Sequence, residues 1–369
     1  MKILRISQTY PTKENNGKGL HAYNYSNNID TPTIVLTKFY NESYLDSKKH
    51  VKLYPIKYWQ RPFDNSKKFN NLIALISFII GQITFFIKSL KIILIFKPDI
   101  IHSQSPHSML IAFFSKMIIR SKLFLTFHGS DLKRLRKISA VMKILDYYDK
   151  IFYVSYQMKP ELIKYYNNEK LFYTPSGLDR EFFLVPPNIN IKRNQFLAVG
   201  NIRWQKDYIT MIKAFKIFNK KNKNYKLIIV GNYNYDDPLY KQIITLIKKY
   251  KLEKFIEFKG SCDRITVKNE MYRSKALLMS SVSEGMPKVI HEAKCCGIPV
   301  ISSDVGSCKD LIGTYGYLFK SKDYKKMSYF INKIIQSQLN LDGIQESTKK
   351  YSWEILTKRI EKKFKESLM

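Results

Sequence analysis

Short apolar runs alternate with amphipathic stretches along the 369 residues of this chain. In the first half, the apolar runs cover residues 2–7, 33–37, 99–104, 123–129, 151–155 and 171–177. In the second half, they cover residues 196–201, 226–232, 255–260, 276–281, 299–304 and 315–319. Between them lie helical patterns such as Tyr208 to Asn219. Alternation of this kind predicts an α/β protein, in which helices cover both faces of parallel sheets.

The series of strands restarts near Phe196, after the linker-like segment Pro186–Asn188. The length also exceeds what one hydrophobic core usually supports. We therefore predict two doubly wound, Rossmann-like domains at 1–185 and 190–345. Residues 346–369 form a final helix, which we expect to pack back toward the N-terminal domain. Ligands of doubly wound sheets bind outside the carboxyl ends of the strands, so we expect the site in a cleft that the two domains face.

The chain is strongly basic, with 63 Lys and Arg against 30 Asp and Glu and a net charge of +33. This charge is typical of proteins that bind nucleic acid, anionic lipid or phosphorylated substrates, although a general bias toward Lys would also produce it. The apolar stretch Leu72 to Ile87 is interrupted by polar residues. We interpret it first as a buried helix, second as a helix in the membrane interface, and third as a membrane span.

Other classes of chemistry are not indicated. Cys262, Cys295, Cys296 and Cys308 form no CxxC pair and have no metal-ligand spacing, which favours reduced, cytosolic thiols. The first seven residues predict a strand, not a secretory signal. No Asp-x-Asp, Walker A, HExxH, GxSxG or GxGxxG pattern occurs, so no metal ion or NAD is expected.

The stretch SEGMPKVIHEAKCCGIPVISSDVG, residues 283–306, brings two carboxylates to the start of a helix. Glu284 and Glu292 are separated by seven residues, and Pro287 suits the first helical position. The backbone amides of residues 285–288 and the positive end of the helix dipole are suited to bind a phosphate. A diphosphate bound there would leave both carboxylates near the hydroxyls of a sugar. The pattern predicts a nucleotide-sugar site.

Three other loops follow predicted strands. VGNIRWQKDY begins at Val199, LTFHGSDL places His128 at a strand end, and the loop after the first strand contains Gly17 and Gly19. Glycines in such a loop allow backbone N–H groups to approach a phosphate.

Taken together, these motifs resemble the retaining family-four glycosyltransferases, which have the GT-B fold. The resemblance covers nearly the whole chain and is strongest from Phe196 to Leu311. It implies that Glu284 contacts the donor sugar and that Glu292 binds the ribose hydroxyls. It places His128 beside the reacting centre and Lys206 on the donor diphosphate. The remaining donor-binding residues that it implies are Gly285, Met286, Pro287, Lys288, Gly200, Asn201, Arg203, Gly17 and Gly19.

One position departs from the family pattern. Where the family usually has an arginine directly after Gly200, this chain has Asn201, and we expect Arg203 to supply the missing charge. The loop with Gly17 and Gly19 also lacks the commoner adjacent pair of glycines.

The resemblance implies a hexosyltransferase-type enzyme that moves a sugar from a nucleotide-diphosphate donor to a hydroxyl acceptor with retention. The expected acceptor is a lipid-linked saccharide of bacterial surface polysaccharide, such as O-antigen or capsule. We expect no cofactor, no metal and no nucleic acid, and a cytoplasmic location at the inner face of an anionic membrane. Two alternatives stay open: a nucleotide-sugar epimerase of the same fold, and a non-catalytic basic protein that binds nucleic acid or membrane.

Overall fold

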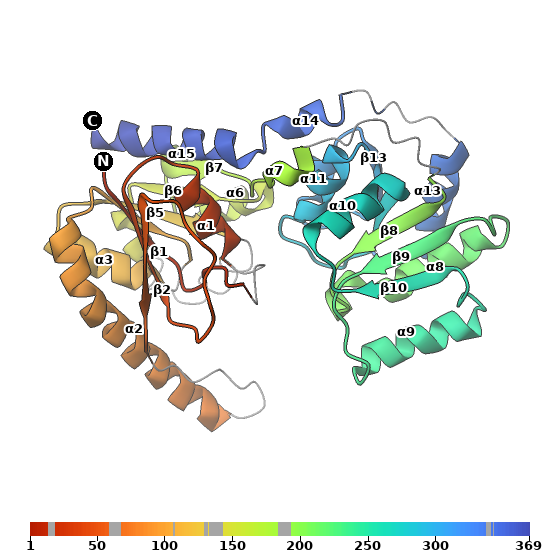
Figure 1. The fold of residues 1–369 in the computed structure, drawn as a ribbon, viewed down its shortest axis with the longest axis horizontal. Helices are drawn as coiled ribbons and strands as arrows, with labels where there is room; N and C mark the ends of the chain where they lie inside the picture. Colours follow the sequence, from red (N-terminus) through yellow and green to blue (C-terminus); the bar gives the residue numbers. More distant parts are fainter. Residues whose placement is uncertain are drawn as a thin grey trace. The chain divides into compact units, whose positions relative to one another are not determined.

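The computed structural model describes residues 1–13, 19–58, 68–105, 108–128, 132, 143–183, 193–336, 341 and 343–369. The chain forms two compact units, Met1–Gly177 with Trp353–Met369, and Leu178–Ser352. Each has a parallel sheet with helices on its faces, as Figure 1 shows, so the predicted fold class is confirmed.

The chain passes from one unit to the other after Gly177 and again after Ser352, about eight residues from the expected boundaries 185 and 345. Leu178 N–H donates to the Tyr351 carbonyl at 2.9 Å, and Leu178 pairs with Ser352 in an isolated bridge. These contacts join both ends of the second unit to each other. The linker-like segment Pro186–Asn188 lies outside the described residues.

The N-terminal sheet has the order β3-β2-β1-β4-β5-β6-β7, and all its pairings are parallel. The strands are β1 (Ile3–Ile6), β2 (Thr33–Lys38), β3 (Val51–Ile56), β4 (Ile100–Ser103), β5 (Lys122–Phe127), β6 (Lys150–Tyr153) and β7 (Leu171–Tyr173). Strand β3 was not among the predicted strands. It is an edge strand whose Lys52, Tyr54 and Pro55 are exposed, so it has no apolar run.

Helices cover both faces of this sheet. They are α1 (Leu20–Asn27), α2 (Lys68–Phe96), α3 (Met109–Ile118), α6 (Lys159–Leu162) and α15 (Trp353–Leu368), with short 3₁₀ turns at Leu145–Tyr147, Tyr156–Met158 and Asn168–Lys170. On one face, Trp353, Ile360 and Phe364 of α15 join Phe124 and Phe152 of the sheet in a buried cluster. The final helix is therefore part of the N-terminal unit.

Helix α2 differs from the expected buried helix. It packs against α3, but several of its isoleucines are exposed, and Ile95 is 72% exposed. High hydrophobicity alone predicted burial, whereas the sheet covers only one side of this long helix. Its stretch Ile79–Phe96 is long and apolar enough to cross a membrane.

The second unit has a sheet of order β10-β9-β8-β11-β12-β13, also parallel. Its strands are β8 (Gln195–Val199), β9 (Lys226–Val230), β10 (Ile256–Gly260), β11 (Ser274–Met279), β12 (Val300–Ser303) and β13 (Gly316–Phe319). Its helices are α7 (Arg180–Phe183), α8 (Tyr208–Asn219), α9 (Pro238–Lys249), α10 (Arg264–Arg273), α11 (Lys288–Cys295), α12 (Cys308–Ile312), α13 (Tyr324–Gln336) and α14 (Glu346–Lys349), with a 3₁₀ turn η5 at Trp204–Lys206.

Alternate strand residues of this sheet pack into two separate cores. Phe196 and Ala198 of β8 belong to the cluster with α8 and α13, whereas Leu197 belongs to the cluster with α10 and α11. Such alternation is what a sheet with helices on both faces requires. It leaves the loops at the carboxyl ends of the strands to carry polar side chains.

Candidate functional site

An ion pair lies at the carboxyl edge of the second sheet. Strands β8 and β11 are neighbours, so the loops that follow them meet. The first loop carries Lys206 and the second carries Glu284. Lys206 Nζ lies 2.6 Å from Glu284 Oε1, and the Ser281 hydroxyl donates to the same oxygen at 2.6 Å. Both charged side chains are partly buried, so the pair is shielded from bulk water.

Backbone contacts fix the two loops relative to each other. Val282 N–H donates to the Gln205 carbonyl at 2.8 Å. The Ser280 hydroxyl donates to the carbonyls of Lys206 and Asp207 at 3.0 and 2.8 Å. These bonds hold the Lys206 backbone against the loop that carries Glu284.

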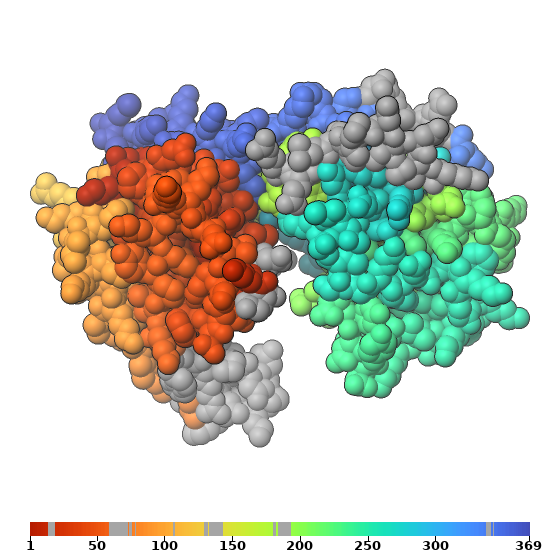
Figure 2. All heavy atoms as spheres, in the orientation of Figure 1, coloured from red at the N-terminus to blue at the C-terminus, as the bar shows by residue number. Residues whose placement is uncertain are grey.

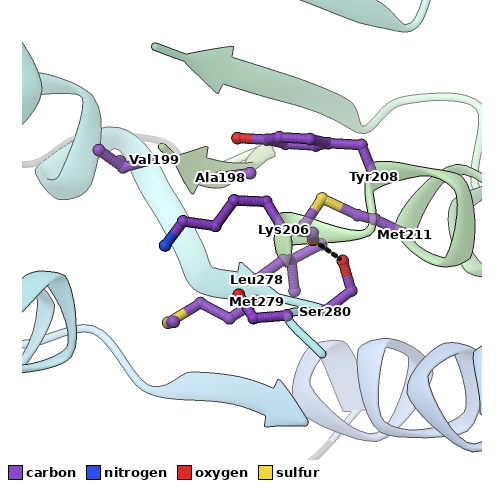
Figure 3. A pocket seen from close by; sticks show the side chains of 9 residues that line it. Ala198, Val199, Lys206, Tyr208, Met211, Leu278, Met279 and Ser280 are labelled. Carbon is purple, nitrogen blue, oxygen red and sulfur yellow. Dashed lines mark hydrogen bonds between the residues drawn. The ribbon is translucent and has the colours of Figure 1, made fainter. Parts of the chain in front are cut away.

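A small pocket adjoins the Lys206 side chain, which Figure 3 shows extended between Tyr208 and Met279. Burial and the nearby Glu284 carboxylate raise the pKa of Tyr208, so its phenol is neutral and donates to the Gly200 carbonyl at 2.5 Å. A Cβ atom on Gly200 would lie 3.0 Å from Lys206 Cε. Glycine at this position leaves room for the lysine.

The loop with Glu284 leads into α11. Pro287 was predicted at the first helical position, but it is the N-cap residue, and α11 begins one residue later at Lys288. The carbonyls of Glu284 and Gly285 pack on Gly306, where a Cβ would lie 2.3 Å from the Glu284 oxygen. Ser307 N–H donates to the Gly285 carbonyl at 3.1 Å. The loop that follows β12 therefore holds the start of α11 in place.

Glu292 lies within α11, between two cations. Burial raises the pKa of Glu292, while Arg264 and Lys288 act to lower it. Burial also lowers the pKa of Lys288 to about 8, against the opposing effect of Glu292. Arg264 pairs in turn with Asp179. A carboxylate that accepts hydrogen bonds therefore lies beside a cation that donates them. This combination suits a ligand with both hydroxyls and phosphates.

Three other predicted donor residues, Asn201, Arg203 and Met286, lie in the same unit. Asn201 and Arg203 are exposed, and the Asn201 amide oxygen accepts from Asn232 N–H at 3.0 Å. Asn201 thus stabilises the adjoining loop. Met286 is half-buried and packs on the core beside α11.

His128 and Gly19 belong to the N-terminal unit. The His128 ring meets His21 edge to face at 4.5 Å between centroids, and His21 lies 3.1 Å from the Ser176 hydroxyl. Gly19 has φ 75°, and a Cβ there would lie 2.4 Å from the Thr9 carbonyl oxygen. The turn into α1 therefore requires glycine. Gly17 lies outside the described residues.

The structure thus brings Glu284 and Gly200 each beside the Lys206 side chain and groups Glu292 with Lys288. Sequence reasoning missed Ser281, Arg264 and His21. Ser281 precedes Glu284 by three residues, and Arg264 directly follows the N-cap residue Asp263. Within the described ranges, no three His, Cys, Asp or Glu side chains gather as a metal site, and the four cysteines are free thiols.

Two family models match the chain. The model of glycosyl transferases group 1 matches residues 179–352, almost the whole second unit. The model of glycosyltransferase family 4 matches residues 60–182. The two matches together extend from residue 60 to residue 352.

Among curated proteins, the chain is 32% identical over 152 residues to the amylovoran biosynthesis glycosyltransferase AmsD of Erwinia amylovora, covering 40% of each chain. It is 31% identical over 149 residues to protein CapJ of Staphylococcus aureus, covering 40% of this chain and 37% of CapJ. Each match thus spans less than half of the relative's length.

Among solved structures, Anabaena Alr3699/HepE in complex with UDP superposes with a TM-score of 0.77 at 16% identity, over 99% of this chain and 100% of that one. The fold match covers both units, and each unit has its own family model. The chain therefore belongs to the family-four type of glycosyltransferases with the GT-B fold.

Proposed function

We propose that the chain transfers a sugar from a nucleotide-diphosphate donor to a hydroxyl group of an acceptor, with retention at the anomeric carbon. The observation that carries the proposal is the contact of 2.6 Å between Lys206 and Glu284. It places a cation suited to a departing diphosphate against a carboxylate suited to sugar hydroxyls. Family membership supports the same reaction class.

Lys206 stabilises the negative charge that grows on the diphosphate as the glycosidic bond breaks. The amides of residues 285–288 at the start of α11 act on the same group. The acceptor hydroxyl attacks the face from which the diphosphate leaves, and a diphosphate oxygen takes its proton. Glu292 accepts hydrogen bonds from the ribose, and Arg203 adds a second cation. His128 is a further catalytic candidate on the family resemblance.

The relatives support a role in surface polysaccharide synthesis. AmsD is named for amylovoran biosynthesis, and the HepE structure contains UDP. We propose a hexose donor, a lipid-linked saccharide acceptor as in O-antigen or capsule synthesis, and a cytoplasmic enzyme at the inner face of the membrane. Lys206 and Arg203 supply the positive charge at the diphosphate, so we propose that neither a metal nor a cofactor is needed.

The test incubates the purified chain with nucleotide sugars and lipid-linked saccharides in the presence of EDTA. We expect transfer that depends on the acceptor, and a product whose anomeric configuration, measured by NMR, matches that of the donor. Conversion of the nucleotide sugar without acceptor would instead identify an epimerase. An inverted product would refute retention, and activity that only manganese restores would refute independence from metal.

A further inference from the structure

Helix α2 has an apolar face that the N-terminal unit leaves uncovered. The exposed side chains recur at intervals of three and four residues, so they line one side of the helix. They are Ile76, Ile79, Ile80, Ile83, Ile87 and Leu94. The opposite side, with Phe85, Ser89 and Ile93, is buried. We call the exposed set the isoleucine stripe.

Helix α3 continues this apolar surface on one flank. Phe114 of α3 lies 5.9 Å from Phe86 of α2, ring centroid to centroid. Met117 and Ile118, in the last turn of α3, are also exposed, Met117 to 71%. Figure 1 shows the two helices side by side at the margin of the unit, and in Figure 2 the orange spheres of α2 form part of its outer edge.

A basic pocket lies on the other flank of the stripe. Ile92, Ile95 and Phe96 of α2 form its apolar wall. Its polar wall consists of Lys2, Lys49, His50, Lys52 and Lys91. Lys2 and Lys49 precede strands β1 and β3, so the pocket lies at the amino edge of the sheet. His128 follows β5 at the opposite, carboxyl edge, where doubly wound sheets bind their substrates.

The charge of this pocket is not neutralised by its neighbours. In the part of the chain that the structure describes, Lys49, Lys52 and Lys91 have no carboxylate within 4.0 Å. Two acidic residues lie nearby, and each is paired with another cation. Asp99 forms an ion pair with the N-terminal amino group at 3.8 Å. Asp30 lies 3.9 Å from Lys48 and is almost fully exposed. Neither α2 nor α3 contains Asp or Glu. A phosphate fits this combination of lysines beside an apolar wall.

We propose that α2 and α3 form a membrane-binding face, in which the isoleucine stripe enters the interfacial layer and the basic pocket holds the phosphate of an anionic lipid headgroup. The helix lies in the membrane surface and does not cross it. The side of α2 opposite the stripe packs on the protein. The apolar sequence is also interrupted by Lys88 and Lys91, and Lys88 donates to the Lys57 carbonyl at 2.8 Å. The inference deepens the proposed function, because a lipid-linked acceptor would reside at the same surface.

The test is flotation of the full chain with vesicles of phosphatidylcholine alone or with 30% phosphatidylglycerol. The pocket variant carries Lys49→Ala, Lys52→Ala and Lys91→Ala, and its matched control carries Lys220→Ala, Lys221→Ala and Lys248→Ala, three exposed lysines of the second unit. Each lysine at an anionic surface contributes about fivefold to binding, so the pocket variant should bind about 100-fold more weakly. The control should bind like wild type.

A second pair of variants tests the stripe. Ile83→Glu with Ile87→Glu should abolish flotation, whereas Ile217→Glu with Ile355→Glu, at exposed positions elsewhere, should not. Unchanged melting temperatures show that the variants fold. Equal flotation of the pocket variant and the lysine control would overturn the proposal. So would equal flotation of wild type with neutral and with anionic vesicles. If inorganic phosphate raised the melting temperature of wild type but not of the pocket variant, while both proteins floated equally, the pocket would be assigned to a soluble phosphate instead. Because flotation involves no sugar transfer, it can fail while the proposed reaction holds.

Discussion

At the scale of single residues, Lys206 is the side chain whose loss should affect turnover most. In the proposed mechanism, Lys206 stabilises charge that develops only as the donor bond breaks, so Lys206→Ala should lower kcat at saturating donor by about 100- to 1000-fold. Steady-state kinetics with Lys220→Ala as control measure this effect. A near-normal kcat in the Lys206→Ala enzyme would show that Lys206 does not stabilise the leaving group. The same assay with Arg203→Ala tests whether Arg203 shares this role.

Glu292 should act on binding of the donor. Two hydroxyls that donate to one carboxylate form charge-assisted bonds worth about 1.5–3 kcal/mol each before desolvation. After that cost, Glu292→Ala should weaken donor binding about 30-fold while the fold survives. Calorimetric titration compares it with Glu253→Ala, an exposed carboxylate of the same unit. Equal donor affinity in both variants would refute the assignment.

If Lys288 contacts the donor as proposed, donor binding should depend on pH. Burial lowers its pKa to about 8, so the side chain is a cation below that pH and loses its charge above it. Since the cation favours the diphosphate, donor affinity should decline as the pH rises from 7 to 9. Lys288→Arg keeps its charge throughout this range and should flatten the profile. Identical profiles for wild type and Lys288→Arg would show that Lys288 does not contact the donor.

At the scale of elements, the loop after β12 supports the loop that carries Glu284. Gly306 and Gly313 have similar φ values, 56° and 58°, but a Cβ at Gly306 would overlap the Glu284 carbonyl, whereas one at Gly313 would meet nothing within 4 Å. Both alanine variants should lose stability, about 1–3 kcal/mol, because both glycines have positive φ, and Gly313 combines φ 58° with ψ −126°. Only Gly306→Ala should also weaken donor binding. Thermal unfolding measures the stability of the two variants, and titration measures their donor affinity. Equal donor affinity in the two variants would contradict this prediction.

The sequence was sufficient to predict most strands, because a strand buried on both faces requires a continuous apolar run. It missed β3, whose position at the sheet edge permits Lys52 and Tyr54 to face solvent. It also assigned the apolar stretch of α2 to the interior. Hydrophobicity shows what a segment prefers, but which neighbours cover it depends on the packing of α3 and the sheet.

The same limit applies to the candidate site. Glu284, Glu292 and Lys206 were predicted from local motifs, since each motif is short and lies at a strand end. The contact between Lys206 and Glu284, however, exists because β8 and β11 are neighbours in the sheet. The contribution of Arg264 also depends on which loops meet, and no local spacing reveals that. Ser281 lies in the same loop as Glu284, three residues before it, so its contact is local.

At the scale of the whole molecule, the chain has two units with separate cores. The groups assigned to the donor, Lys206, Glu284, Lys288 and Glu292, all come from the second unit. Donor binding should therefore stabilise the native protein, by about 2.7 kcal/mol when the ligand is present at 100 times its dissociation constant. For a unit of this size that corresponds to a shift of about 5–10 °C in melting temperature.

The most direct test of the central claim is the melting temperature of wild type and Glu292→Ala with a panel of UDP, GDP, ADP and dTDP sugars. We predict that sugars of one nucleotide raise the melting temperature of wild type by several degrees, and that the same concentration raises that of Glu292→Ala much less. If no nucleotide sugar raised the melting temperature, or if both proteins shifted equally, the assignment of this site to a nucleotide-sugar donor would be contradicted.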